Sequence, residues 1–246
     1  MSRILIGKKI FKKNDQIEFL KSSLDYNQAH TFNKKLNQFK SKKTVVHGAN
    51  ILLYALEFLF NLRKIKIHNF SCNFLKPIFL NENIKFYFYK EDNENFIEIE
   101  NNKNVICAKV FIKIEKSDNQ KKIISKDNYI KVLRSKKITN IDPLSFLKKN
   151  FKIDLIKNKK FLKFPKITKM YGNFFCDALC SASYFVGMKC PGQKSIFTNI
   201  SINLSALNKN CGYLLFNINH YEKKIRLFSI NIEGFIKMNI KSIYLG

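Results

Sequence analysis

The sequence lacks an apolar run long enough to cross a membrane. Its longest apolar stretch lies within residues 49–60 and is interrupted by Asn50 and Glu57, whereas a membrane helix needs about 20 predominantly apolar residues. The first fifteen residues also lack the long apolar segment and the small-residue cleavage site of a signal peptide. We therefore expect a cytoplasmic protein without a membrane span.

Several motifs of common enzyme and metal sites are missing as well. There is no glycine-rich phosphate loop and no Gly-x-Ser-x-Gly motif, which argues against an α/β-hydrolase. The six cysteines form no Cys-x-x-Cys pair, and no cysteine and histidine cluster has the spacing of a zinc site. The missing zinc spacing predicts no bound metal, and the missing secretory signal predicts reduced thiols.

Acidic residues are scarce. The chain has 18 Asp and Glu against 45 Lys and Arg, which gives a formal net charge of +27. Such a charge favours polyanionic partners, namely nucleic acid, an anionic membrane, a phosphorylated cofactor or an acidic carrier protein. However, lysine is spread through every segment and arginine, the better bidentate phosphate ligand, is rare. The dispersed pattern therefore favours compositional drift and disfavours a nucleic-acid partner.

Two stretches of the chain share one pattern. Residues 45–59 read VVHGANILLYALEFL and residues 169–183 read KMYGNFFCDALCSAS. Each places a ring-bearing residue before a glycine, Gly48 or Gly172, and continues as an apolar helical run. The first run is apolar on every side, which is typical of a helix inside a core. The pattern therefore predicts two equivalent helices in two halves of the chain.

Strand-like segments follow each helix. They are rich in β-branched and aromatic residues and show partial alternation; they span 64–80, 84–89, 96–100 and 105–114 after the first helix, and 195–204, 213–221 and 225–240 after the second. A lysine-rich stretch near 115–128 separates the two sets. We expect two domains, 1–120 and 121–246, each with one helix and an antiparallel sheet.

The stretch SLDYNQAH, residues 23–30, gathers polar side chains in a chain with only four histidines. Asp25 and His30 are a carboxylate and an imidazole, the types that exchange protons near neutral pH. Asp25 and Asn27 are equally typical of turns, where their side chains bond nearby backbone. Spacing alone leaves both interpretations open.

This stretch resembles the Asp-x-Asn-Pro-x-His signature of the MaoC-like (R)-specific enoyl-thioester hydratases, which have the hotdog fold. In that family a His-Gly pair downstream opens the central helix, and His47 and Gly48 stand at this place. The resemblance covers most of residues 15–115. Leu24 and Gln28 replace the Gly and Pro of the family, and both residues normally shape the loop.

The resemblance implies an α+β fold made of two hotdog halves, each an antiparallel sheet wrapped around a central helix. It implies hydration of trans-2-enoyl thioesters to (R)-3-hydroxyacyl thioesters, or the reverse dehydration, on coenzyme A or acyl carrier protein. Asp25 and His30 would be the catalytic pair, Asn27 would orient the loop or the water, and the backbone N–H of Gly48 would hold the thioester oxygen. The second half, which lacks the signature, would complete the acyl pocket as a partner within the chain.

Other functions remain open on the same residues. A hotdog thioesterase also uses a carboxylate near a helix N-terminus, and a non-catalytic acyl-binding or nucleic-acid-binding protein would need no reacting pair. We expect no metal and no cofactor beyond the coenzyme A or phosphopantetheine that carries the substrate. A homodimer of the whole chain is also compatible with the resemblance. We expect His47, His68 and His220 to be structural.

Overall fold

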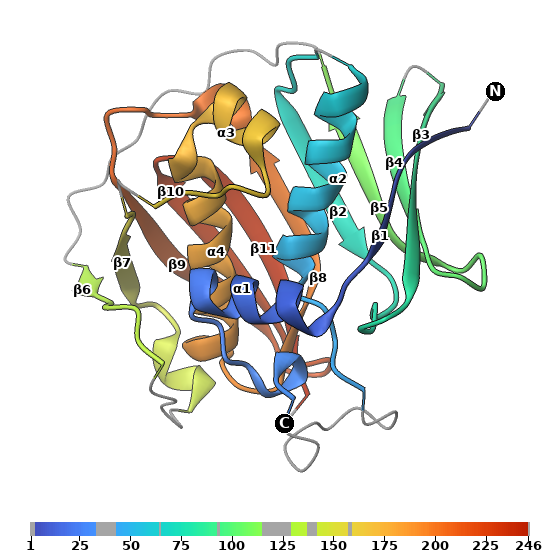
Figure 1. Ribbon diagram of the computed structural model, residues 1–246. Helices are drawn as coiled ribbons and strands as arrows, with labels where there is room; N and C mark the ends of the chain where they lie inside the picture. Colours follow the sequence, from blue (N-terminus) through green and yellow to red (C-terminus); the bar gives the residue numbers. More distant parts are fainter. Residues whose placement is uncertain are drawn as a thin grey trace.

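The computed structural model describes residues 3–32, 43–63, 65–92, 94–114, 129–136, 142–156 and 159–245. A single sheet of eleven strands runs through the described residues, and its helices lie on one face (Figure 1). The sequence predicted a linker near 115–128 and a division between residues 120 and 121. Both lie outside the described residues.

The strands of the first half are β1 (Ile4–Ile10), β2 (Asn69–Phe74), β3 (Asn83–Glu91), β4 (Glu94–Glu100) and β5 (Ile106–Lys113). Those of the second half are β6 (Ile130–Lys131), β7 (Asn150–Asp154), β8 (Ser195–Asn203), β9 (Tyr213–Glu222), β10 (Leu227–Gly234) and β11 (Lys237–Tyr244). The α helices are α1 (Lys13–Ser23), α2 (Gly48–Leu62), α3 (Pro165–Tyr171) and α4 (Asn173–Met188), and short 3-10 turns span Gln28–His30, Pro143–Phe146 and Leu204–Ala206.

Apart from the short outermost strand β6, the strand order is symmetric about the junction of β2 and β8. It runs β1-β3-β4-β5-β2-β8-β11-β10-β9-β7-β6, so that β2 and β8 join the halves and each half repeats the same sequence of pairings outward. β2 and β8 are antiparallel, with Cys72 opposite Ile200. All the pairings are antiparallel except that of the short β6 with β7. This confirms the α+β class and the predicted order of a helix followed by antiparallel strands.

The two long helices are buried because they are apolar on nearly every side. In α2, Leu52, Leu53, Ala55 and Leu56 have no exposed surface. In α4, every residue from Phe175 to Met188 is buried. The strands turn alternate residues toward these helices, as β3 does with Ile84, Phe86 and Phe88. The helix predicted over 48–60 is confirmed, with its start at Gly48.

Each of the two shorter helices packs against the long helix of the other half. α1, from the first half, packs on α4, and α3, from the second half, packs on α2 (Figure 1). The chain that leaves α1 therefore enters the space between α2 and α4. This crossing places residues 24–30 at the junction of the two halves.

Two strand predictions need correction. The segment 225–240 was predicted as one strand, but it is a hairpin in which β10 ends at Gly234 and β11 begins at Lys237. Gly234 permits this turn because its φ is +110° and a Cβ there would lie 2.5 Å from the carbonyl oxygen of Tyr213. Only residues 69–74 of the predicted strand 64–80 form β2. None of the described helices combines the length and the apolar character needed to span a membrane.

Candidate active site

The loop after α1 is shaped without the glycine and proline of the family signature. Leu24 ends α1 in the left-handed conformation with φ of 59° and donates its N–H to the carbonyl of Leu20, so it adopts the conformation that usually favours glycine. Gln28 donates its N–H to Oε1 of Gln193 at 2.9 Å. A proline at position 28 could not make this bond. Both departures are therefore accommodated by local contacts.

Asn27 fastens the loop to the second half. Its Nδ2 donates to the carbonyl of Ser195 at 2.7 Å, and its Oδ1 accepts from the N–H of Lys194 at 3.3 Å. The same oxygen accepts from Ala29 N–H and caps the 3-10 turn that carries His30. The side chain of Asn27 thus joins the loop to the second half and caps the turn that carries His30.

Asp25 is buried against α4, with 2 % of its surface exposed. Its Oδ2 accepts a hydrogen bond from Oγ of Ser183 at 2.7 Å, and its Oδ1 accepts from the N–H of Asn27 at 3.2 Å. Burial raises the pKa of Asp25 to about 7, although both hydrogen bonds act to lower it. The carboxyl group therefore changes charge near neutral pH.

The ring of His30 lies near Asp25, and one of its nitrogens is held by a hydrogen bond to the backbone. Its Nδ1 lies 2.9 Å from the carbonyl oxygen of Val45, and because a carbonyl only accepts, this nitrogen carries the proton. The Nε2 of His30 is left with a lone pair. Burial lowers the pKa of His30 to about 4, so the ring is neutral at physiological pH.

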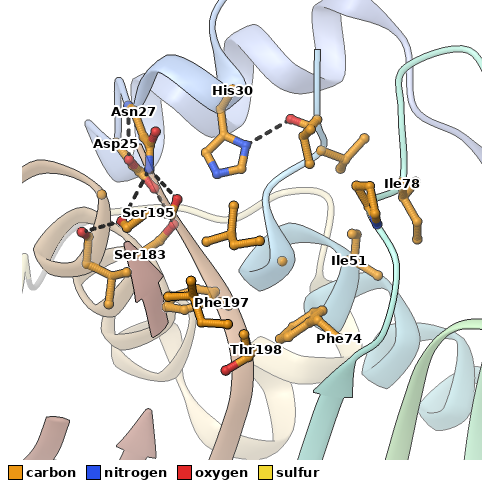
Figure 2. A pocket seen from close by; sticks show the side chains of 18 of the residues that line it. Asp25, Asn27, His30, Ile51, Phe74, Ile78, Ser183, Ser195, Phe197 and Thr198 are labelled. Atoms are coloured by element: carbon orange, nitrogen blue, oxygen red, sulfur yellow. Dashed lines mark hydrogen bonds between the residues drawn. The ribbon is translucent and has the colours of Figure 1, made fainter. Parts of the chain in front are cut away.

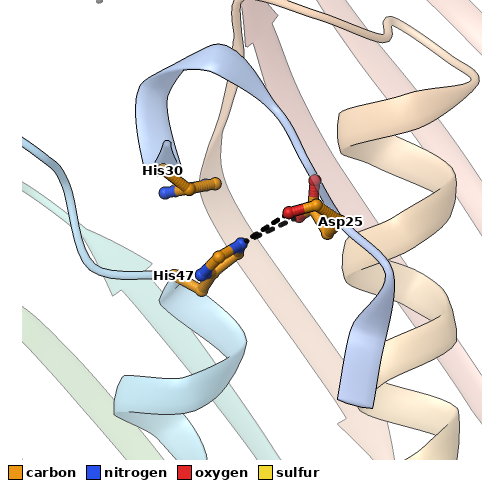
Figure 3. Close-up of side chains that lie close together, drawn as sticks. All are labelled: Asp25, His30 and His47. Atoms are coloured by element: carbon orange, nitrogen blue, oxygen red, sulfur yellow. Dashed lines mark hydrogen bonds and ion pairs between the residues drawn. The ribbon is translucent and has the colours of Figure 1, made fainter. Parts of the chain in front are cut away.

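His47 lies next to both Asp25 and His30 (Figure 3). Its Nε2 donates to the backbone carbonyl of Asp25 at 3.0 Å and lies 3.6 Å from the carboxylate Oδ2. Its ring stacks on that of His30 with the centroids 3.8 Å apart. Burial, and then the neighbouring His30, lower the pKa of His47. As predicted, His47 packs and hydrogen-bonds at the helix start.

Asp25 and His30 open into a cavity of about 270 Å³ between the halves (Figure 2). Most of its wall is apolar, and it is lined from the first half by Asp25, Asn27, His30, Val45, Val46, Gly48, Ile51, Phe74, Leu75, Lys76, Pro77 and Ile78, and from the second half by Ser183, Val186, Gly187, Ser195, Ile196, Phe197, Thr198 and Ile243. Both halves thus contribute residues to the cavity wall.

The start of α2 forms one wall of the cavity. Gly48 begins the helix, where the first N–H groups have no intrahelical acceptor, and the side chain of His47 does not cap them. A Cβ on Gly48 would lie 3.0 Å from the ring of Phe74 and 3.2 Å from that of Phe197. Gly48 therefore lets two aromatic rings, one from each half, pack against the helix start.

Asp25, His30 and His47 also form a group with the composition of a metal site, with one ligand atom from each lying within 4.8 Å of the others. The hydrogen bonds limit this use. Nδ1 of His30 is committed to Val45 and Nε2 of His47 to the carbonyl of Asp25. A metal on Nε2 of His47 would break that bond, whereas Nδ1 of His47 is buried without a hydrogen-bond partner among the described residues.

The structure brings together the four residues singled out in the sequence: Asp25, Asn27, His30 and Gly48 all line the cavity. His68 and His220 do not line it; His68 bonds Ser205 Oγ at 2.9 Å through its Nδ1. The sequence did not identify Ser183 and Gly187, which contact Asp25 from α4. The sequence around Ser183 gives no local signal for this contact, because Asp25 lies 158 positions away along the chain.

Comparison with known proteins supports the fold. No protein-family model and no curated protein sequence matches the chain. Among solved structures, a protein described as a MaoC-like dehydratase aligns with a TM-score of 0.57 at 8% identity over 99% of this chain and 98% of its own. A putative MaoC domain protein dehydratase from Chloroflexus aurantiacus J-10-fl aligns with a TM-score of 0.58 at 6% identity, over 98% of this chain and 94% of its own.

A putative oleoyl thioesterase from Lactobacillus plantarum aligns with a TM-score of 0.50 at 8% identity, over 100% of this chain and 97% of its own. At these identities the likeness concerns the fold, and it extends over both halves of the sheet. The chain therefore has the hotdog fold that its sequence resemblance predicted, with a central helix and an antiparallel sheet in each half.

Proposed function

We propose that the chain catalyses the hydration of trans-2-enoyl thioesters to (R)-3-hydroxyacyl thioesters, and the reverse dehydration, on coenzyme A or acyl carrier protein. The observation that carries this proposal is the placement of Asp25 and His30 on one apolar cavity, with side-chain atoms within 4.8 Å of each other. One water or one substrate hydroxyl can contact both, since each hydrogen bond spans about 2.8 Å.

The protonation states favour acid–base chemistry by this pair. In the dehydration direction, Asp25 gives its proton to the leaving β-hydroxyl and His30 takes the α-proton on its free Nε2. A pKa near 7 keeps Asp25 largely protonated below neutral pH, and a pKa near 4 keeps His30 neutral. Hydration follows the same steps in reverse, with Asp25 taking the proton of the attacking water.

The helix start supplies the third requirement of the reaction. The thioester oxygen gains negative charge as the α-proton leaves, and unpaired N–H groups at a helix N-terminus stabilise such a charge. The N–H of Gly48 is assigned this task because Gly48 lines the cavity beside the pair. Phe74 and Phe197 keep this end of the cavity apolar, which strengthens the interaction.

A thioesterase is the second candidate, because a carboxylate beside a helix start also suits attack of water on a thioester. The two reactions require opposite forms of Asp25. Dehydration needs the protonated carboxyl, so its rate falls as pH rises through about 7. Hydrolysis needs the carboxylate as base, so its rate rises through the same pH.

The test measures both products across pH with 3-hydroxyacyl and trans-2-enoyl thioesters of short and long chains on both carriers. We expect kcat/KM for dehydration to be bell-shaped, with limits near pH 4 and pH 7 set by His30 and Asp25. Free thiol that appears without a change in the conjugated double bond, at a rate that rises with pH, would establish the thioesterase instead.

Substitution tests the pair itself. Asp25→Asn and His30→Ala should each lower turnover by about 10²–10⁴-fold, the usual contribution of general acid–base catalysis. Because the two side chains act on one substrate, the double variant should be little worse than the poorer single variant. Hydration that survives both substitutions would show that the pair takes no part in the reaction.

A further inference from the structure

One face of α4 is fitted to the carboxyl group of Asp25. Ser183 and Gly187 lie one turn apart on this helix, and both line the cavity. Figure 2 shows the side chain of Ser183 at the cavity wall. Oγ of Ser183 donates to Oδ2 of Asp25 at 2.7 Å, and Ser183 is 2 % exposed. A Cβ on Gly187 would lie 1.9 Å from Oδ1 of Asp25, so any side chain at 187 would displace the carboxyl.

We propose that Ser183 is a positioning residue, whose hydroxyl holds the Asp25 carboxyl at the cavity and sets the pH range over which that carboxyl carries its proton. Gly187 provides the space that this arrangement requires. The second half of the chain would thereby influence the pKa of Asp25, which belongs to the first half, in addition to lining the cavity. The catalytic meaning of this tuning rests on the proposed function, but the effect on the titration of Asp25 does not.

The groups around Asp25 explain why a single hydroxyl has this influence. His47 lies 3.6 Å from Oδ2, and both His47 and His30 have lowered pKa values, so neither ring supplies a positive charge at neutral pH. On α4, burial raises the pKa of the Cys180 thiol to about 12, so it also is neutral. The bonds from Ser183 and from Asn27 N–H are what offset the burial of the carboxylate.

Loss of the Ser183 hydroxyl should therefore change the pKa of Asp25 in one direction, upward. The ionised carboxylate loses one of two donors, while the protonated carboxyl loses less because its oxygens attract a donor more weakly. The pKa of Asp25 should rise further above its usual range. A hydrogen bond to a charged group is worth enough to shift a titration by about one to two pH units.

The experiment is a ¹³C NMR titration of the Asp25 carboxyl carbon in the full chain, with the resonance assigned from its loss in Asp25→Asn. Ser183→Ala should raise the midpoint by about one to two pH units. Ser181→Ala is the matched control, because Ser181 is a buried serine of the same helix whose Oγ donates to the carbonyl of Asp177. That control should leave the midpoint unchanged.

Ser183→Cys provides a second variant of nearly the same volume in case the alanine variant does not fold. A thiol is a weak donor, so its midpoint should also rise. An unchanged midpoint in either folded variant overturns the proposal, and so does an equal shift in Ser181→Ala.

Activity separates this result from the proposed function. If the chain dehydrates 3-hydroxyacyl thioesters, the falling limb of the kcat profile should move in Ser183→Ala by the same number of pH units, with KM nearly unchanged. A falling limb that stays in place while the NMR midpoint moves would overturn the catalytic part of the proposal. The NMR midpoint of Asp25 could also shift in a protein that turns over no thioester. That result would refute the proposed function and would still support the positioning role of Ser183.

Discussion

Asp25 links the chemistry of the site to the stability of the protein. Its pKa is 3.8 in an exposed chain and about 7 in the folded protein, so between these values the folded state binds more protons than the unfolded state. Stability from this group is complete below pH 3.8 and is lost as pH rises through about 7. His30 acts in the opposite sense, because its pKa falls from 6.5 to about 4 and stability is lost as pH falls through that window.

Asp25→Asn should therefore stabilise the fold at pH 8 and have little effect at pH 4. The difference in free energy of unfolding approaches about 4 kcal/mol as an upper bound, from roughly three pKa units at about 1.4 kcal/mol each. Thermal unfolding of both proteins between pH 4 and pH 8 provides the measurement. Asp92→Asn, at an exposed turn position with φ of 44°, is the control. A stability difference that does not vary with pH would contradict the prediction.

The sequence could identify the residues of the site that lie close together along the chain. Asp25, Asn27 and His30 form one short signature, and Gly48 follows from the start of an apolar helix. The contact of Ser183 with Asp25 could not be predicted from the sequence, because the two residues are 158 positions apart. A serine among apolar residues carries no local sign of the carboxylate that it will meet.

At the scale of elements, the N-terminus of α3 is capped by a side chain from another helix. Its N-cap residue, Phe164, makes no side-chain capping bond. Glu57 of α2 takes that part, with its two carboxylate oxygens accepting the N–H groups of Lys166 and Ile167 at 3.0 and 3.1 Å. Because Glu57 is 6 % exposed, these two bonds also satisfy a buried carboxylate and tie α2 to α3.

Glu57→Gln should loosen α3 and destabilise the fold by about 1–3 kcal/mol, since one acceptor oxygen is replaced by a donor that faces an N–H. Denaturant unfolding measures the global effect, and hydrogen exchange at Lys166 and Ile167 measures the local one. Glu233→Gln, at an exposed strand position, is the control and should change neither. Unchanged protection of the two amides would show that Glu57 does not cap α3.

The elements that the sequence predicted are those whose pattern is set by burial. α2 is apolar all round, and strands such as β3 alternate clearly between buried and partly exposed residues. α1 was not predicted, because its sequence, KNDQIEFLKSS, is mostly polar and only four of its residues are buried. The hairpin of β10 and β11 was read as one strand, because Phe235 and Ile236 at its turn are apolar and fully buried.

At the scale of the whole molecule, the net charge of +27 should govern weak contacts with polyanions. We expect unrelated RNA to bind with a Kd of about 10⁻⁴–10⁻⁶ M at physiological salt, and the affinity to fall steeply as salt rises, because dispersed lysines act mainly by releasing counterions. Fluorescence anisotropy across a salt series, with two unrelated RNA sequences, measures this. Tight binding to one sequence that resists salt would instead identify a nucleic-acid-binding function.

The symmetric strand order has a consequence for how the two halves differ. Ser183 of α4 and Leu59 of α2 both stand eleven residues after the glycine, Gly172 or Gly48, that the repeated sequence pattern places at the helix start. In an assembly of two identical subunits, one residue type would have to serve both as the hydroxyl that meets a carboxylate and as a core leucine with no exposed surface. A single chain encodes the two helices separately. One helix can therefore carry the serine that binds Asp25, and the other can carry a leucine that packs in the core.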